Sequence, residues 1–96
     1  MKVVWAPAAE RDRDDIWEAI ALDSPLAAVR MDDLFVAATE RVGAFPKLGR
    51  AGQISGTREW IVHESYRLVY EIKAHEDLIR VLAVVHTARQ WPSESK

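Results

Sequence analysis

Apolar residues recur with the periodicity of a helix in the first half of the chain and with that of a strand in the second. A β-branched and aromatic run at residues 3–5 opens the chain and is stopped by Pro7, which predicts a short strand. Over residues 8–22 the apolar positions recur at helical spacing, with Ile16 and Ile20 four residues apart. The pattern therefore predicts a strand followed directly by a first helix.

A second helix has clear start and stop signals. Ser24 is a good N-cap, and Pro25 stands at the first helical position, where its missing N–H costs nothing. Gly43 is expected to supply a left-handed C-cap, and Pro46 prevents continuation. The link between the two helices is short, so we expect an antiparallel hairpin. The predicted apolar face of the second helix consists of Ala27, Met31, Leu34, Ala38, Val42 and Phe45.

The second half of the chain has the pattern of a β-meander. After a glycine-rich loop at residues 44–56, strand-like runs occupy residues 57–62, 66–73 and 78–86. In the middle run, Tyr66, Leu68, Tyr70 and Ile72 alternate with Arg67, Val69, Glu71 and Lys73. The short turns between the runs predict antiparallel pairing. We therefore predict one domain over residues 1–96 of the α+β class, with an N-terminal strand and a helical hairpin on one face of an antiparallel sheet.

This architecture leaves one face of the sheet without a cover. Both predicted helices precede the meander and can protect only one side of it. The other side carries Val69 between Arg67 and Glu71, together with alternate residues of the last strand. A face that is half apolar and half charged is typical of a groove for a partner protein.

Composition excludes several classes of protein. Apolar residues make up 49% of the chain and charged residues 29%, which is ordinary for a soluble globular domain. No apolar run approaches the roughly 18 residues of a membrane span, and the N-terminus lacks a secretory signal, so we expect a cytoplasmic protein without a membrane role. There is no cysteine, and the three histidines lack metal-ligand spacing, so we expect no disulfide, metal or cofactor. The pI near 5.9 means that nucleic-acid binding would need local clustering of basic residues.

Arg67 is the first residue that invites a chemical interpretation. On an open sheet face its guanidinium could hold a phosphate or a carboxylate with two hydrogen bonds. A cross-strand salt bridge to Glu71 or Glu59 is the structural alternative. The sequence leaves both open.

The end of the last strand supplies the other candidates. His86 could transfer a proton and Arg89 could stabilise an anion. Their spacing alone favours a structural role, in which His86 bonds the backbone and Arg89 pins the tail. Trp91 is either a contact anchor or, as we expect more, a residue that folds back onto the core.

Taken together, these segments resemble the RelE/ParE toxin superfamily, and the resemblance lies closer to ParE. It runs through nearly the whole chain in a shared order and spacing. The segments that carry it are Ala8-Ala9-Glu10 with Asp14-Asp15-Ile16-Trp17, Asp23-Ser24-Pro25-Leu26-Ala27-Ala28, Phe45-Pro46 with Gly49-Arg50, Gly56-Thr57-Arg58-Glu59, Tyr66-Arg67-Leu68-Val69-Tyr70-Glu71 and His86-Thr87-Ala88-Arg89-Gln90-Trp91-Pro92.

The resemblance implies the toxin of a type II toxin–antitoxin module, held in a hetero-oligomer by an antitoxin whose C-terminal segment wraps around it. ParE-type members poison DNA gyrase, whereas RelE-type members cut messenger RNA in the ribosomal A site. RelE-like cleavage relies on basic residues and a C-terminal Tyr or His-Tyr. Arg67 matches the family's strand, but no tyrosine follows Tyr70, so His86 and Arg89 would be the remaining catalytic candidates.

The missing proton-transfer set favours a ParE-like gyrase inhibitor. The alternatives are a ribosome-dependent endoribonuclease and an inactive module that only binds an antitoxin. No catalytic residue is assigned firmly. The residues expected to contact antitoxin or target are Arg58, Glu59, Arg67, Val69, Glu71, His86, Arg89 and Trp91.

Overall fold

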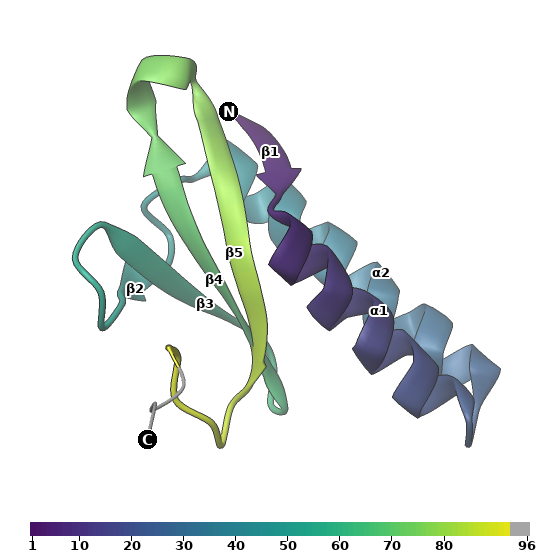
Figure 1. The fold of residues 1–96 in the computed structure, drawn as a ribbon. Coiled ribbons are helices and arrows are strands. Elements are labelled where there is room, and N and C mark those ends of the chain that lie inside the picture. The colour runs from purple at the N-terminus through teal and green to yellow at the C-terminus, as the bar shows by residue number, and fades with distance from the viewer. Residues whose placement is uncertain (93–96) are drawn as a thin grey trace.

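The computed structural model describes residues 1–92 and has two layers, a sheet and a helical hairpin (Figure 1). In chain order the elements are β1 (Lys2–Trp5), α1 (Pro7–Ala21), α2 (Pro25–Ala44), β2 (Arg50–Ala51), β3 (Thr57–His63), β4 (Tyr66–Lys73), the 3-10 turn η1 (Ala74–Glu76) and β5 (Leu78–His86). The strands form one sheet in the order β1-β5-β4-β3-β2. Both helices lie on the same side of this sheet, which confirms the predicted α+β class.

The sheet is mixed, whereas we expected an antiparallel one. The meander β3-β4-β5 is antiparallel as predicted, but β1 pairs with β5 in parallel, with Val3 opposite Ile79 and Trp5 opposite Val81. A two-residue strand, β2, also lies within the predicted loop and pairs with β3. The alternation of apolar residues shows that a segment is a strand but carries no information about its neighbour or direction.

Gly43 does not cap α2 in the predicted way. The helix continues to Ala44, and the capping residue Phe45 has a φ of −132°, outside the left-handed region. Gly43 instead makes room for the start of the chain. The amino group of Met1 donates to the carbonyl of Gly43 at 2.9 Å, and a Cβ at Gly43 would stand 3.0 Å from the Met1 carbonyl oxygen and 3.2 Å from Val3 Cγ2.

The buried stripe of α2 is turned by about one residue from the predicted one. The hydroxyl of Ser24 accepts the N–H of Ala27 at 3.1 Å, so the predicted N-cap is confirmed. However, Leu34 is 40% exposed and Phe45 is 63% exposed. Apolar residues at adjacent positions allow two stripes on the same helix, and packing on the sheet selects one of them. The buried residues are Ala28, Phe35, Ala38, Val42 and Gly43.

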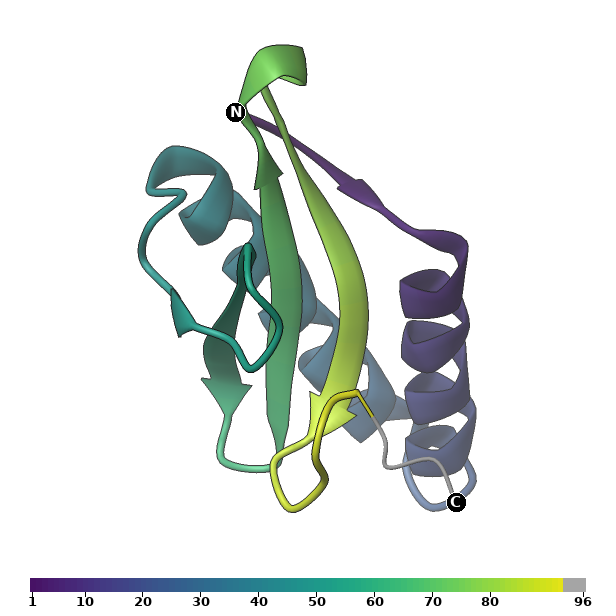
Figure 2. The ribbon, with the colours of Figure 1, turned by 60° about the vertical axis from the view of Figure 1, so that its left-hand side comes forward.

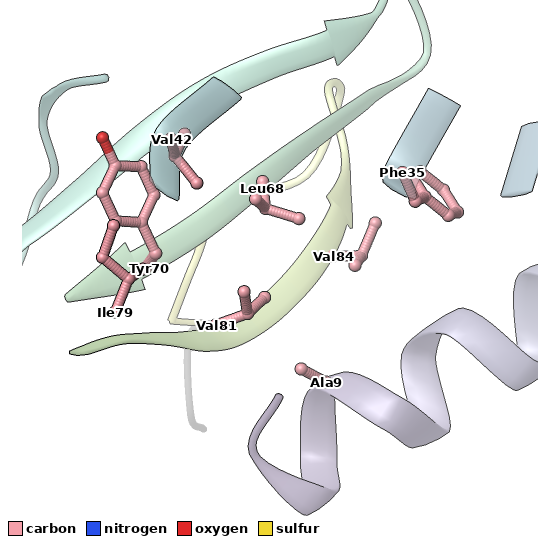
Figure 3. Packing of buried hydrophobic residues seen from close by; sticks show 8 residues of the cluster. All are labelled: Ala9, Phe35, Val42, Leu68, Tyr70, Ile79, Val81 and Val84. Carbon is pink, nitrogen blue, oxygen red and sulfur yellow. The ribbon is translucent and has the colours of Figure 1, made fainter. Parts of the chain in front are cut away.

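The core lies between the sheet and the helices (Figure 3). Leu68 and Tyr70 point into it, as the alternation predicted. On β5 the pairing shifts, because Val69 is opposite Ala83 while Tyr70 is opposite Val81, which leaves one extra residue in β5. This bulge restarts the alternation and explains the nearly continuous apolar run of β5. The core residues are Ala9, Phe35, Val42, Leu68, Tyr70, Ile79, Val81 and Val84.

An ion pair joins the two helices. Nε and Nη2 of Arg13 donate to the two carboxylate oxygens of Asp32 at 2.6 and 2.7 Å, and the guanidinium stacks on Trp5 at 4.9 Å from the ring centroid. The hydrogen bond between the two side chains raises the pKa of Arg13 and lowers the pKa of Asp32. This ion pair joins α1 to α2 and includes no residue of strands β2–β5.

Tyr70 anchors the loop that follows α2. Its hydroxyl donates to the carbonyl of Pro46 at 2.7 Å and accepts the N–H of Gly49 at 2.9 Å. A Cβ on Gly49 would stand 2.8 Å from both this hydroxyl and the Glu59 carbonyl, so only glycine fits here. Desolvation in the core raises the pKa of Tyr70 above its ordinary value.

We expect Tyr70→Phe to lower the free energy of unfolding by about 1–3 kcal/mol, because it leaves the Gly49 N–H and the Pro46 carbonyl without a partner. The raised pKa also predicts a pH effect. The neutral phenol is favoured in the folded state, so its contribution is complete below the unfolded pKa of about 10 and is lost as pH rises through the folded pKa. Urea denaturation at pH 8 and above pH 10 measures both effects. An equal loss of stability at high pH in wild type and Tyr70→Phe would contradict the assignment.

Candidate functional site

Arg67 lies on the sheet face away from the helices and is held entirely by the protein's own chain. Its Nη1 donates to the carbonyls of His86 at 3.2 Å and Thr87 at 3.4 Å, and its Nη2 donates to the carbonyl of Arg89 at 2.7 Å. Its Nε is 2.9 Å from Oε1 of Glu59, off the N–H direction, so this contact is an ion pair and not a hydrogen bond. We call Arg67, Glu59 and the three carbonyls the Arg67 cluster.

Of the two salt bridges expected for Arg67, to Glu59 or to Glu71, the structure shows the one to Glu59. Glu59, on the neighbouring strand β3, is the partner, and Glu71 instead lies 3.5 Å from the ammonium of Lys73. The exposed Arg50 approaches Glu59 from the other side at 3.8 Å. A buried ion pair is stable only when its remaining polar atoms are bonded, and the three carbonyls meet this need for Arg67.

We expected the sheet face away from the helices to be uncovered, and this is wrong for the centre of that face. Val69 is fully buried, and Glu59 and Arg67 are only 7% and 8% exposed. After β5 the chain turns back across the sheet on the side opposite α2 (Figure 2). Arg67 bonds the backbone of this returning segment. Arg67, Glu59 and Val69 are therefore not available to a partner in this conformation.

The returning segment, residues 86–92, forms what we call the C-terminal turn. Thr87 fixes its start, because its N–H donates to the Ser65 carbonyl and its hydroxyl donates to the Glu64 carbonyl, both at 2.8 Å. Nδ1 of His86 accepts the N–H of Ala88 at 3.1 Å. The predicted structural role of His86, bonding backbone at the end of the strand, is confirmed.

The outer side of the C-terminal turn is polar and accessible. His86, Arg89 and Gln90 are exposed, and Trp91 is half-buried. Among residues 1–92, the Arg89 side chain forms no ion pair, and Trp91 is not a member of the core cluster. The turn therefore presents a cation, an amide and part of an indole side by side.

Two hollows of about 280 and 290 Å³ lie beside the C-terminal turn, between α1 and β5. Asp12, Val84, His86 and Arg89 line both of them. Oδ2 of Asp12 accepts the N–H of Val84 at 3.0 Å. The pairing of β1 with β5 ends at Trp5 and Val81, so this side chain supplies the acceptor that a longer β1 would have provided. Trp91 lines the first hollow only.

The sequence interpretation missed Asp12, although a signal was present. Asp12 stands three residues after the buried Ala9 and four before Ile16, so it lies on the helix stripe that faces the sheet. An acidic residue at such a position needs a polar partner, and the unpaired edge of β5 supplies one.

Two of the predicted contact residues lie elsewhere in the structure. Nη1 of Arg58 donates to the carbonyl of Gly49 at 2.7 Å and so supports the loop after α2. Glu71 is half-buried beside Lys73. The structure therefore gathers His86, Arg89 and Trp91, with Arg67 and Glu59 beneath them, and leaves Arg58 and Glu71 apart from this group.

The geometry offers little for acid–base catalysis. The guanidinium of Arg67 is engaged, and one ring nitrogen of His86 accepts a backbone N–H. The other ring nitrogen of His86 and the side chain of Arg89 remain, beside Asp15 and an Asp12 carboxylate that already accepts the Val84 N–H. In residues 1–92 no three His, Asp or Glu side chains come together as a metal site, and neither helix is long and apolar enough to cross a membrane.

Comparison with known proteins identifies the family. The model of the ParE toxin of the type II toxin–antitoxin system parDE matches residues 3–91. The chain belongs to the ParE toxin family. It is 32% identical over 92 residues to the candidate toxin Y4kP of Sinorhizobium fredii, with 95% of this chain and 93% of that protein covered.

A solved structure has the same fold as this ParE-family chain. It is described as the chromosomal ParDE TA system from P. aeruginosa, and the match has a TM-score of 0.76 at 20% identity. It covers 90% of this chain and 95% of the other. The resemblance recognised in the sequence, to the RelE/ParE superfamily and closer to ParE, is thus confirmed.

Proposed function

We propose that this ParE-family toxin inhibits DNA gyrase in the bacterial cytoplasm and that its C-terminal turn contacts the enzyme. The observation that carries the proposal is the accessible row of His86, Arg89 and Gln90 on a turn that the Arg67 cluster holds in place. Arginine and tryptophan are enriched among residues that dominate protein interfaces. The turn therefore suits recognition of a protein surface.

Cleavage of RNA is less well supported by the same residues. It would need a proton donor, a proton acceptor and a stabilising cation within reach of one phosphate. Arg67, the residue that matches the family's strand motif, is closed off beneath the C-terminal turn. His86 and Arg89 share a hollow with Asp12 and Asp15, but Asp12 is engaged by the Val84 N–H, and two carboxylates beside the site would repel a phosphate.

We further propose that a cognate antitoxin neutralises the toxin in a hetero-oligomer. The helical hairpin supports this, because Leu22 is 89% exposed, and Leu26 and Val29 are also exposed. Apolar side chains grouped on a surface are typical of a site for another protein. The matched solved structure is itself described as a toxin–antitoxin system.

A gyrase assay with ATP and relaxed plasmid tests the proposal. We expect the wild type to block supercoiling and to accumulate cleaved plasmid. Arg89→Ala should raise the concentration needed for half inhibition by about tenfold or more, the usual effect of losing a hot-spot arginine. Arg80→Ala is the matched control, because Arg80 is exposed on β5 and lies outside the C-terminal turn.

Unchanged supercoiling with wild-type toxin would refute gyrase inhibition. Toeprinting on translating ribosomes then tests the nuclease, which predicts cuts at fixed codon positions that disappear in Arg89→Ala. Induction in cells without an antitoxin tests the inactive module, which predicts normal growth.

A further inference from the structure

We infer that Arg67, with Glu59, is a positioning residue that fixes the C-terminal turn in the conformation needed to recognise the target. It acts through the backbone of the turn and does not contact the target itself. The inference rests on the proposed function, because it assigns the exposed side of the turn as the recognition surface.

The bonds of Arg67 determine the path of the chain after β5. One guanidinium donates to the carbonyls of His86, Thr87 and Arg89, and so fixes the direction of three peptide groups within four residues. The shortest of these bonds, 2.7 Å, holds the carbonyl of the peptide bond between Arg89 and Gln90. A planar fork of donors can serve several acceptors at once, which a lysine ammonium on a flexible stem does less well.

The turn has few other attachments. Thr87 ties its start to the turn between β3 and β4. Among residues 1–92, no hydrogen bond is formed by residues 90–92. Among residues 1–92, Arg89 is held by two hydrogen bonds, one from its N–H to the His86 carbonyl at 2.9 Å within the turn and one from Arg67 to its own carbonyl. The second joins Arg89, and the chain that follows it, to β4.

Glu59 sets the direction of the guanidinium. Its carboxylate is as buried as Arg67, and its Oε1 lies 2.9 Å from Nε, while Nη1 and Nη2 are the nitrogens that reach the turn. With Nε held beside β3, Nη1 and Nη2 point toward the returning backbone. The ion pair also compensates the charge of a side chain that has little water around it.

A double variant, Glu59→Leu/Arg67→Met, separates positioning from stability. Apolar side chains of similar volume often replace a buried ion pair without loss of stability, but they cannot bond the carbonyls of the turn. The matched control, Arg13→Met/Asp32→Leu, removes the ion pair between the helices and leaves the turn intact. Thermal unfolding establishes whether both variants fold. Arg67→Lys, which keeps the charge beside Glu59, is a second test should the double variant not fold.

Limited trypsin digestion followed by mass spectrometry measures the turn directly. Trypsin must open the backbone around Arg89 before it cuts the Arg89–Gln90 bond. We expect this cut to be about tenfold faster or more in Glu59→Leu/Arg67→Met than in wild type, since charge-assisted hydrogen bonds are lost. The control should be cut at the wild-type rate. The same samples are then used in the gyrase assay, where only the variant of the Arg67 cluster should lose inhibition.

Each result has one meaning. An unchanged cutting rate would overturn the inference, because the turn would then hold without Arg67. Faster cutting with full gyrase inhibition would also overturn it, because the target would not need a fixed turn. Faster cutting with lost inhibition supports it. If wild-type toxin does not inhibit gyrase, the proposed function fails, and the trypsin rates still decide whether Arg67 positions the turn.

Discussion

Replacing Arg67 with alanine should lower the free energy of unfolding by about 3–5 kcal/mol, the usual effect of removing one partner of a buried ion pair. Glu59 would keep its negative charge in a site where it is only 7% exposed. Arg50, at 3.8 Å and mostly in solvent, compensates this charge weakly. The carbonyls of His86, Thr87 and Arg89 would lose their donor at the same time.

Urea denaturation at neutral pH measures this loss. Adding Glu59→Gln to Arg67→Ala removes the isolated charge, so we expect the double variant to regain part of the stability. This cycle separates the cost of the unpaired carboxylate from that of the lost hydrogen bonds. A loss below about 1 kcal/mol in Arg67→Ala would show that the site is open to water and that the cluster does not stabilise the sheet.

Phe35→Ala should also cost about 3–5 kcal/mol, because it opens a cavity where the ring is fully buried between α2 and the sheet. The ring makes a T-shaped contact with Tyr66 at 5.9 Å between centroids, and Tyr66 makes another with His86 at 5.6 Å. This series of edge contacts connects the core to the start of the C-terminal turn. The cavity therefore also removes support from His86.

Leu34→Ala is the matched control for Phe35→Ala. The two residues are neighbours on α2, but Leu34 is 40% exposed, so we expect a loss of less than about 1 kcal/mol. Chemical denaturation of both variants measures the difference. Equal losses would contradict this packing and would mean that α2 contacts the sheet through Leu34 as much as through Phe35.

Local patterns in the sequence determined the elements and their class. The N-cap Ser24 and the prolines at 25 and 46 placed α2 correctly, because they act within one turn of the helix, whereas the C-cap expected at Gly43 was wrong. The alternation in residues 66–73 assigned Leu68 and Tyr70 to the core, because successive side chains of a strand point to opposite faces. The ordered motifs also identified the family, which the match over residues 3–91 confirms.

The tertiary structure alone decided which residues are accessible. Alternation placed Arg67 and Val69 on the second face of the sheet but did not show what covers that face. The cover is the C-terminal turn, held by hydrogen bonds between Arg67 and residues 19 to 22 positions later. The parallel pairing of β1 with β5 likewise joins residues more than seventy positions apart. A pattern of neighbouring residues cannot predict contacts between residues so distant in the sequence, because these contacts depend on how the whole chain folds.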